Sequence, residues 1–121
     1  MKSYTNLEQS KKLAEILPFE SADMYYTHGA VVPDTMIGCK RDYRCYTICW
    51  SLAALLDVLE GELDGEEGET YQLKIEKNGT WWYLWYQEEY DDENTIETKS
   101  TEELLDACYL MIVKLHEQNL L

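Results

Sequence analysis

Residues 71–86 read YQLKIEKNGTWWYLWY, with Asn78-Gly79 at the centre. An Asn-Gly pair between two β-prone runs predicts a β-hairpin, because a two-residue type I′ turn requires positive φ at both positions. This turn predicts a register in which Ile75 faces Trp82, with an apolar face that belongs to the core. The other expected pairs are Lys77–Thr80, Leu73–Leu84 and Tyr71–Tyr86 on the apolar face, and Glu76–Trp81, Lys74–Tyr83 and Gln72–Trp85 on the opposite face.

Helices are predicted on both sides of the hairpin, at residues 6–17, from 47 up to the glycine at 61, and from 100 towards the C-terminus. Asn6 with Gln9, and Ser100 with Glu103, form capping-box patterns. The apolar stripe of the last helix is expected to consist of Leu104, Cys108, Met111, Ile112 and Leu115.

The remaining segments complete the expected fold. Residues 94–98 are predicted to add a third strand, because an isolated hairpin is rarely stable, and residues 20–26 a short turn of helix. The connection at 27–44 is either functional or contains a strand that its pattern hides. Strands grouped between helices indicate an α+β fold. We expect an antiparallel sheet of about three strands, built on one hairpin and packed against about three helices, in a single domain over residues 1–121.

The net charge of −14 on 121 residues is the strongest feature of the composition. Acidic residues concentrate at 57–69 and 88–93, and charge of this sign repels phosphate backbones and anionic membranes. We therefore expect no direct binding to nucleic acid or membrane. No apolar run is long enough to span a bilayer, and the first residues lack the apolar segment of a signal peptide. These features predict a cytoplasmic protein.

Three phrases cover most of the chain outside residues 27–44 and the acidic loop: NLEQSKKLAEILPFESADMYY (6–26), CWSLAALLDVL (49–59) and LLDACYLMIVKLHEQNLL (104–121). They resemble small uncharacterised proteins of gut Bacteroidales genomes and of the phages and mobile elements that these bacteria carry. The resemblance implies no particular activity, cofactor or catalytic residue. An origin in a mobile element favours a protein that acts by binding host or phage machinery.

Two clusters were weighed as catalytic or metal sites. Cys49 before Trp50 is typical of a thiol nucleophile at a helix start, with His28 or His116 as the base, but the papain-type spacing and glycine are missing. Zinc would take Cys45 and Cys49 with Cys39 and His28, although no second paired unit exists. The acidic loop at 60–69 lacks the ligand register of a calcium-binding EF-hand loop. We therefore expect buried, reduced cysteines, no metal, no cofactor and no catalysis.

The second face of the hairpin and the acidic stretches are the predicted partner-binding surfaces. Exposed aromatic side chains on a sheet mark an interface, and carboxylates steer a basic partner. The predicted contact residues are Trp81, Tyr83, Trp85, Glu66, Glu67, Asp91 and Asp92. The leading hypothesis is a small acidic domain that binds a protein partner. Three alternatives remain: an acidic nucleic-acid mimic that inhibits a DNA-binding protein, a thiol hydrolase that uses Cys49, and self-association through the hairpin. The aromatic face is also open to being covered by another part of the same chain.

Overall fold

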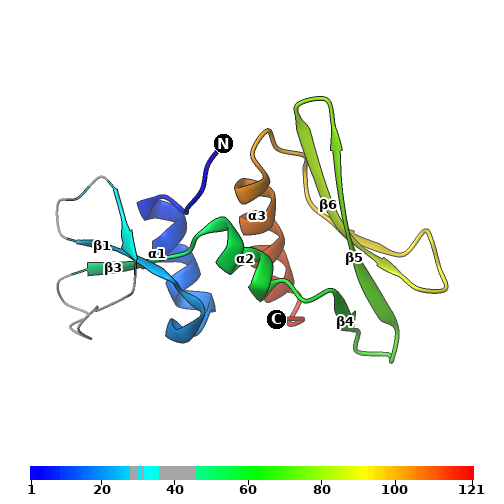
Figure 1. The fold of residues 1–121 in the computed structure, drawn as a ribbon. Helices are drawn as coiled ribbons and strands as arrows, with labels where there is room; N and C mark the ends of the chain where they lie inside the picture. Colours follow the sequence, from blue (N-terminus) through cyan, green and yellow to red (C-terminus); the bar gives the residue numbers. More distant parts are fainter. Residues whose placement is uncertain (28–29, 31, 36–45) are drawn as a thin grey trace. The chain divides into compact units, whose positions relative to one another are not determined.

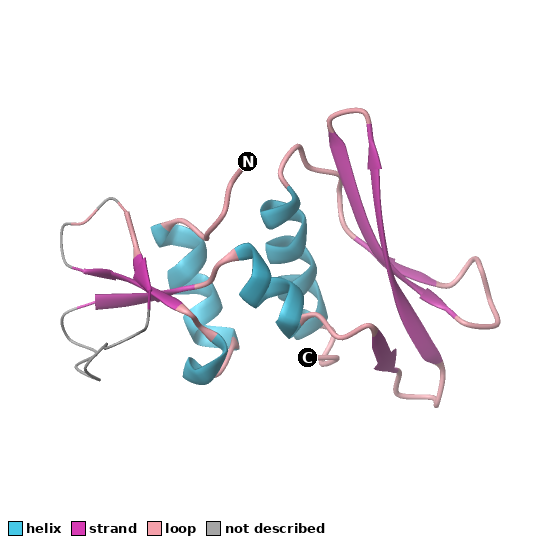
Figure 2. Cartoon of the chain, in the orientation of Figure 1, coloured by secondary structure: helices cyan, strands magenta, loops and turns pink. Residues whose placement is uncertain are grey.

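The computed structural model describes residues 1–27, 30, 32–35 and 46–121. In these residues the chain has an α+β fold, with three α-helices and two antiparallel sheets (Figures 1 and 2). The predicted fold class is therefore confirmed, with one sheet more than expected. The chain divides into two compact units, Lys2–Val58 and Leu59–Leu121, the second of which includes Met1. A single domain over residues 1–121 stays a prediction.

The unit Lys2–Val58 combines helices with a small sheet of strand order β2-β1-β3. Its elements are α1 (Leu7–Ile16), the 3₁₀ turn η1 (Phe19–Ser21), β1 (Met24–Thr27), β2 (Asp34–Thr35), β3 (Tyr46–Cys49) and α2 (Leu52–Val58). The capping box predicted for the first helix is confirmed. The Gln9 amide N–H donates to Asn6 Oδ1 at 2.8 Å, and the Asn6 amide N–H donates to Gln9 Oε1 at 3.1 Å. Helix α1 packs against β3.

One prediction in this unit is confirmed in part and another is wrong. The short turn of helix predicted within residues 20–26 is η1, which ends at Ser21, but residues 24–26 belong to strand β1. The second helix was expected from Thr47, but residues 46–49 form β3, which pairs antiparallel with β1. Both segments are rich in aromatic and β-branched side chains, which suit a strand. Helix α2 begins only after Ser51, whose Oγ accepts from the Ala54 amide at 3.1 Å as an N-cap. The connection at 27–44, predicted to be either functional or to contain a hidden strand, contains the short strand β2.

A network of polar groups around Thr5 lies in the core of this unit. Thr5 is fully buried, and its Oγ1 accepts from the Trp50 amide N–H at 3.1 Å and shares a hydrogen bond of 2.8 Å with Ser10 Oγ. The Tyr26 hydroxyl donates to the Thr5 carbonyl at 2.8 Å, and the Thr5 amide donates to the Trp50 carbonyl at 2.9 Å. Cys49 Sγ lies 3.4 Å from Thr5 Oγ1. These contacts join the N-terminal segment to the end of β3.

The unit Leu59–Leu121 carries the second sheet, in the order β4-β5-β6-β7, with one helix on one face. Its elements are β4 (Glu62–Asp64), β5 (Thr70–Asn78), β6 (Trp81–Glu88), β7 (Thr95–Glu97) and α3 (Leu104–Glu117). Strand β7 confirms the predicted third strand. Strand β4 was not predicted, because it lies within an acidic stretch that reads as a loop. Figure 1 shows α3 beside β6, on the side of the sheet that forms the core of this unit.

The hairpin forms as predicted, but its register is shifted by two residues. Asn78 pairs with Trp81 and Ile75 with Leu84, so the turn consists of Gly79 and Thr80. Gly79 has φ 64° in the first central position of the turn, and Thr80 has no positive φ. This is the pattern of a type II′ turn, which requires glycine only in the first position. A shift of two residues leaves each side chain on its predicted face, because side chains alternate with a period of two.

Helix α3 confirms the predicted apolar stripe, since Leu104, Cys108, Met111, Ile112 and Leu115 are all buried. The predicted capping box is wrong. The helix begins at Leu104 with Glu103 as the N-cap residue, and Glu103 makes no side-chain capping hydrogen bond to the helix. Instead of Ser100, the neighbouring Thr101 donates its hydroxyl proton to the Glu103 carbonyl at 2.6 Å. In the described parts of the chain, no helix combines the length and the apolar character needed to cross a membrane.

Candidate functional site

The face of the second sheet that points away from α3, here called the open face, carries the three predicted aromatic contact residues. Trp81, Tyr83 and Trp85 alternate along β6, so they share this face. Trp81 is 44% exposed, Tyr83 is 39% exposed and Trp85 is half-buried. Trp85 is oriented by its Nε1–H, which donates to Gln87 Oε1 at 3.3 Å. Among the described residues of the unit Leu59–Leu121, no helix or further strand packs on this face. The structure thus brings these residues together as one exposed row.

Charged residues from three neighbouring strands share the open face. Strand pairing places Glu76 opposite Tyr83, and both Lys74 and Glu97 opposite Trp85. Residues opposite each other in a sheet share a face, so these side chains flank the aromatic row. The sequence did not identify Glu97 as part of this surface, because its strand is short and its register depends on pairing with β6. The same applies to Glu62 on the unpredicted strand β4, which pairs with Gln72.

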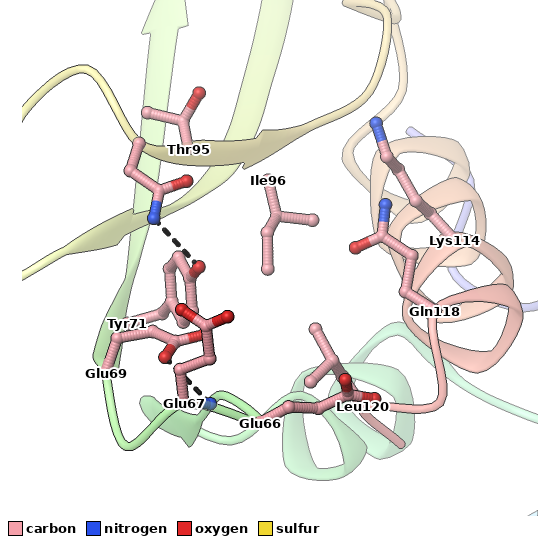
Figure 3. Close-up of a pocket in the computed structure, with 10 residues that line it drawn as sticks. Glu66, Glu67, Glu69, Tyr71, Thr95, Ile96, Lys114, Gln118 and Leu120 are labelled. Atoms are coloured by element: carbon pink, nitrogen blue, oxygen red, sulfur yellow. Dashed lines mark hydrogen bonds between the residues drawn. The ribbon is translucent and has the colours of Figure 1, made fainter.

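A pocket of about 500 Å³ lies within the same unit, at the end of the sheet that is remote from the hairpin turn (Figure 3). The loop between β4 and β5 contributes Glu66, Glu67 and Glu69 to its wall, and α3 contributes Lys114. The Glu69 carboxylate accepts from the Glu67 amide at 3.0 Å. The Lys114 ammonium donates to the carbonyl of Glu97. The acidic loop is thus a defined hairpin loop, and two predicted contact residues, Glu66 and Glu67, line this pocket.

Tyr71 forms part of the pocket wall and is buried. Its hydroxyl accepts from Asn94 Nδ2 at 3.0 Å, and the same Nδ2 donates to Glu88 Oε2 at 3.0 Å. Burial is the main cause that raises the pKa of the Tyr71 hydroxyl, and the carboxylates of Glu69 and Glu88 add to it. The phenol therefore stays protonated at neutral pH.

The predicted contact residues Asp91 and Asp92 lie in the turn between β6 and β7. Both are exposed, and both organise the turn: Asp91 Oδ1 accepts from the Glu93 amide at 3.0 Å, and Asp92 Oδ1 accepts from Gln87 Nε2 at 2.9 Å. This turn lies at the same end of the sheet as the β4–β5 loop. Nine residues of β5 separate that end from the hairpin turn, which corresponds to roughly 30 Å. The predicted site therefore consists of two surfaces, an acidic end and an aromatic open face.

Almost all of the net negative charge of the protein lies in one unit. Residues 59–121 contain 17 acidic and 4 basic side chains, a net charge of −13, whereas residues 2–58 contain 7 acidic and 6 basic side chains, a net charge of −1. The aromatic row thus lies in a strongly negative unit. An exposed apolar surface with such a background favours positively charged partners.

The described cysteines have the environment of core residues. Cys49 and Cys108 are free thiols and are fully buried. Burial raises the pKa of both thiols, that of Cys108 to about 12. A nucleophilic cysteine requires the opposite shift, because the thiolate is the reactive form. Cys39, Cys45 and His28, which the zinc and thiol hypotheses used, lie outside the described residues. Within the described ranges, no group of three or more His, Cys, Asp or Glu side chains is arranged to hold a metal ion.

No family model, curated protein or solved structure matches this chain. The resemblance to small proteins of gut Bacteroidales and their phages stays a prediction.

Proposed function

We propose that this chain is a small acidic binding domain that holds a basic protein partner on its open face and has no catalytic activity of its own. The observation that carries this proposal is the exposure of Trp81 and Tyr83, side by side on a sheet face that no described element of their unit covers. Large aromatic side chains in such a position expose apolar surface that contact with a partner would remove from water.

The size of the contact supports a protein as the partner. A buried Trp or Tyr contributes on the order of 200 Å² of surface. At 44% and 39% exposure, Trp81 and Tyr83 together still offer about 170 Å². Covering half to all of this area is worth about 2–4 kcal/mol at roughly 25 cal/mol per Å². Trp and Tyr are among the residues that dominate binding energy at protein interfaces. A flat, partly polar sheet face also suits a protein surface better than it suits a small molecule, which requires a concave pocket.

Charge supports a basic partner. The unit that bears the open face has a net charge of −13, and Glu76 and Glu97 flank the aromatic row. Charges around a contact mainly raise the association rate and exclude partners of the same sign. We therefore expect association to slow as salt is added, while the aromatic contacts maintain the bound state.

An acidic nucleic-acid mimic is the second candidate function. The observation that favours it is the clustering of Glu66, Glu67, Asp91 and Asp92 at one end of the sheet, away from Trp81 and Tyr83. A mimic would bind through these carboxylates, and the aromatic row would contribute little. The two candidates therefore predict different effects for substitutions at the two surfaces.

The test is affinity capture with four forms of the protein: wild type, Trp81→Ala/Tyr83→Ala, Tyr90→Ala and Glu66→Gln/Glu67→Gln/Asp91→Asn/Asp92→Asn. The resemblance suggests a gut Bacteroidales lysate as the source. Tyr90 is a matched control, because it is an aromatic residue that is 90% exposed but lies in the β6–β7 turn. The proposal predicts one protein partner that the Trp81/Tyr83 variant loses and the Tyr90 variant retains. Loss only in the carboxylate variant would support the mimic instead, and equal capture by all four forms would contradict both candidates.

The proposal includes a cytoplasmic location, which two buried free thiols support. The burial of Cys49 and the raised pKa of its thiol count against the thiol hydrolase.

A further inference from the structure

One edge of the β5–β6 hairpin has no pairing partner along just over half the length of β5. Strand β4 pairs with β5 only at Thr70–Gln72, and the Leu73 amide donates to the Gly61 carbonyl at 2.9 Å. Beyond Leu73, no described strand of the unit Leu59–Leu121 pairs with this side of β5. Residues 74–78, here called the open edge, are all exposed, and Ile75 retains 43% exposure.

The direction of the backbone groups on the open edge follows from the register. The pair Asn78–Trp81 closes a two-residue turn, so even-numbered residues of β5 exchange hydrogen bonds with β6. Odd-numbered residues therefore point their N–H and C=O groups away from β6, as the Leu73–Gly61 hydrogen bond shows. Ile75 and Lys77 thus present two donors and two acceptors to an additional strand.

The other edge of the hairpin is closed. Beyond β7, Trp82 and Thr101 exchange two backbone hydrogen bonds of 2.6 and 3.1 Å. The outer carbonyl of Glu97 on β7 accepts from the Lys114 ammonium. In the described part of the unit Leu59–Leu121, the open edge is therefore the long exposed edge available for strand addition.

We infer that the open edge of β5 is a strand-addition site that pairs with an extended basic segment of the protein partner. This inference rests on the proposed function and gives it a binding mode. An added strand would place alternate side chains on the open face, level with Lys74 and Glu76 and next to the aromatic row. A Lys or Arg of the added strand opposite Glu76 would be attracted by the Glu76 carboxylate and would lie on the same face as Tyr83.

A second copy of this chain does not fit the open edge. Three antiparallel registers align the outward backbone groups of two copies of β5, but the one that pairs Ile75 with Ile75 would bring Lys77 of the second copy opposite Leu73, where Gly61 already lies. In one of the two remaining registers Glu76 faces Glu76 of the second copy, and in the other Lys77 faces Lys77. Like charges directly opposite each other destabilise strand pairing, and each copy carries −13 in this unit. Charge complementarity therefore favours a basic segment from a different protein.

The probe is a synthetic peptide of alternating Val and polar residues with a single central Lys that can face Glu76 and Thr at the other polar positions, so that no Lys has to face Lys74. This Val/Lys peptide is compared with a Val/Glu peptide that has Glu in place of the Lys. Two N-methylated forms of the Val/Lys peptide test the backbone directly: one is methylated at the residues whose N–H groups face β5, and the other at the intervening residues. Because either alternating set of residues can face β5, one form is methylated at the odd-numbered residues of the peptide and the other at the even-numbered residues. Isothermal titration calorimetry measures the affinities with the wild-type protein, so the result does not depend on the folding of a variant.

Strand addition predicts that the Val/Lys peptide binds more tightly than the Val/Glu peptide. It also predicts that methylation of one alternating set weakens binding by roughly tenfold per removed hydrogen bond, while methylation of the other set is tolerated. On the protein, Lys77→Pro removes an outward N–H and is expected to weaken binding roughly tenfold, whereas Lys77→Ala keeps this N–H and most of the affinity. Circular dichroism establishes that both variants are folded.

Two results would overturn the inference. One is the absence of Val/Lys peptide binding, and the other is binding that methylation of either set leaves unchanged. If methylation of either set leaves the affinity of the peptide unchanged and Trp81→Ala/Tyr83→Ala abolishes its binding, strand addition fails while the open face still binds the partner. If the open-face variant and the Lys77 variants capture a protein partner as well as the wild type does, the proposed function itself fails.

Discussion

The buried network around Thr5 allows a sharp prediction about the stability of the unit Lys2–Val58. Replacing Thr5 by Val preserves the volume of the side chain but removes the acceptor of the Trp50 amide and the hydroxyl partner of Ser10. Thr5 and Ser10 are fully buried, so water does not replace these bonds. The buried Trp50 amide left without a partner costs about 1–3 kcal/mol and the lost hydrogen bond to Ser10 adds about 1 kcal/mol, so the Val variant should lose about 3 kcal/mol of unfolding free energy.

Thr5→Ser is the matched control. It keeps the hydroxyl and loses one methyl group, which costs about 1 kcal/mol. The order of stability should therefore be wild type, then Thr5→Ser, then Thr5→Val, although Val is the closer match in volume. Urea unfolding followed by far-ultraviolet circular dichroism measures both differences, provided that the m value is unchanged. A Thr5→Val variant as stable as Thr5→Ser or more stable would show that the network contributes little, and would refute the reasoning.

The buried thiols give two further predictions. In a variant with Cys39→Ser and Cys45→Ser, Cys49 and Cys108 should not react with a disulfide reagent until the protein is unfolded, because both thiols are buried and burial raises their pKa. Rapid reaction of Cys49 in the folded protein would support the thiol hydrolase instead. The protein should also lose stability as pH rises above about 9, where the unfolded state releases the Cys108 proton that the folded state keeps up to a pKa of about 12. The loss of unfolding free energy amounts to at most about 1.4 kcal/mol per pH unit for each such thiol, and it is absent below the pKa of the unfolded state. Urea unfolding at pH 7 and at pH 10 measures this loss, which should be smaller in Cys108→Ala. An equal loss in this variant would contradict the assignment to Cys108.

The segments with strong local signals could be predicted from the sequence. Asn6 with Gln9, the leucine-rich stripe of the last helix and the glycine of the hairpin turn each act over a few residues, so their patterns are readable without a fold. The hairpin register was missed by two residues because Gly79 fits a type II′ turn as well as a type I′ turn. Adding the pair Asn78–Trp81 also brings the Lys77 ammonium to 5.3 Å from the centre of the Trp82 ring.

The first sheet could not be predicted, because its strands are stabilised by each other. Residues 46–49 continue the apolar spacing of the following helix, and only pairing with Met24–Thr27 makes them a strand. Strand β4 could not be predicted for a similar reason, since Leu63 is its one buried side chain and lies between acidic neighbours. For the candidate site, the sequence predicted that the aromatic row shares one face. The charged neighbours Glu62 and Glu97 depended on strand pairing and were missed.

The proposed function requires a protein partner to contact the open face at Tyr83. The most direct measurement is photo-crosslinking in a lysate, with p-benzoylphenylalanine in place of Tyr83 in one variant and in place of Tyr90 in another. Both positions are exposed tyrosines in the same acidic unit, so charge affects them alike. A partner on the open face should give one dominant basic protein crosslinked from position 83, and little or none from position 90. Crosslinking of this protein from position 90 alone, or to the same extent from both positions, would contradict it.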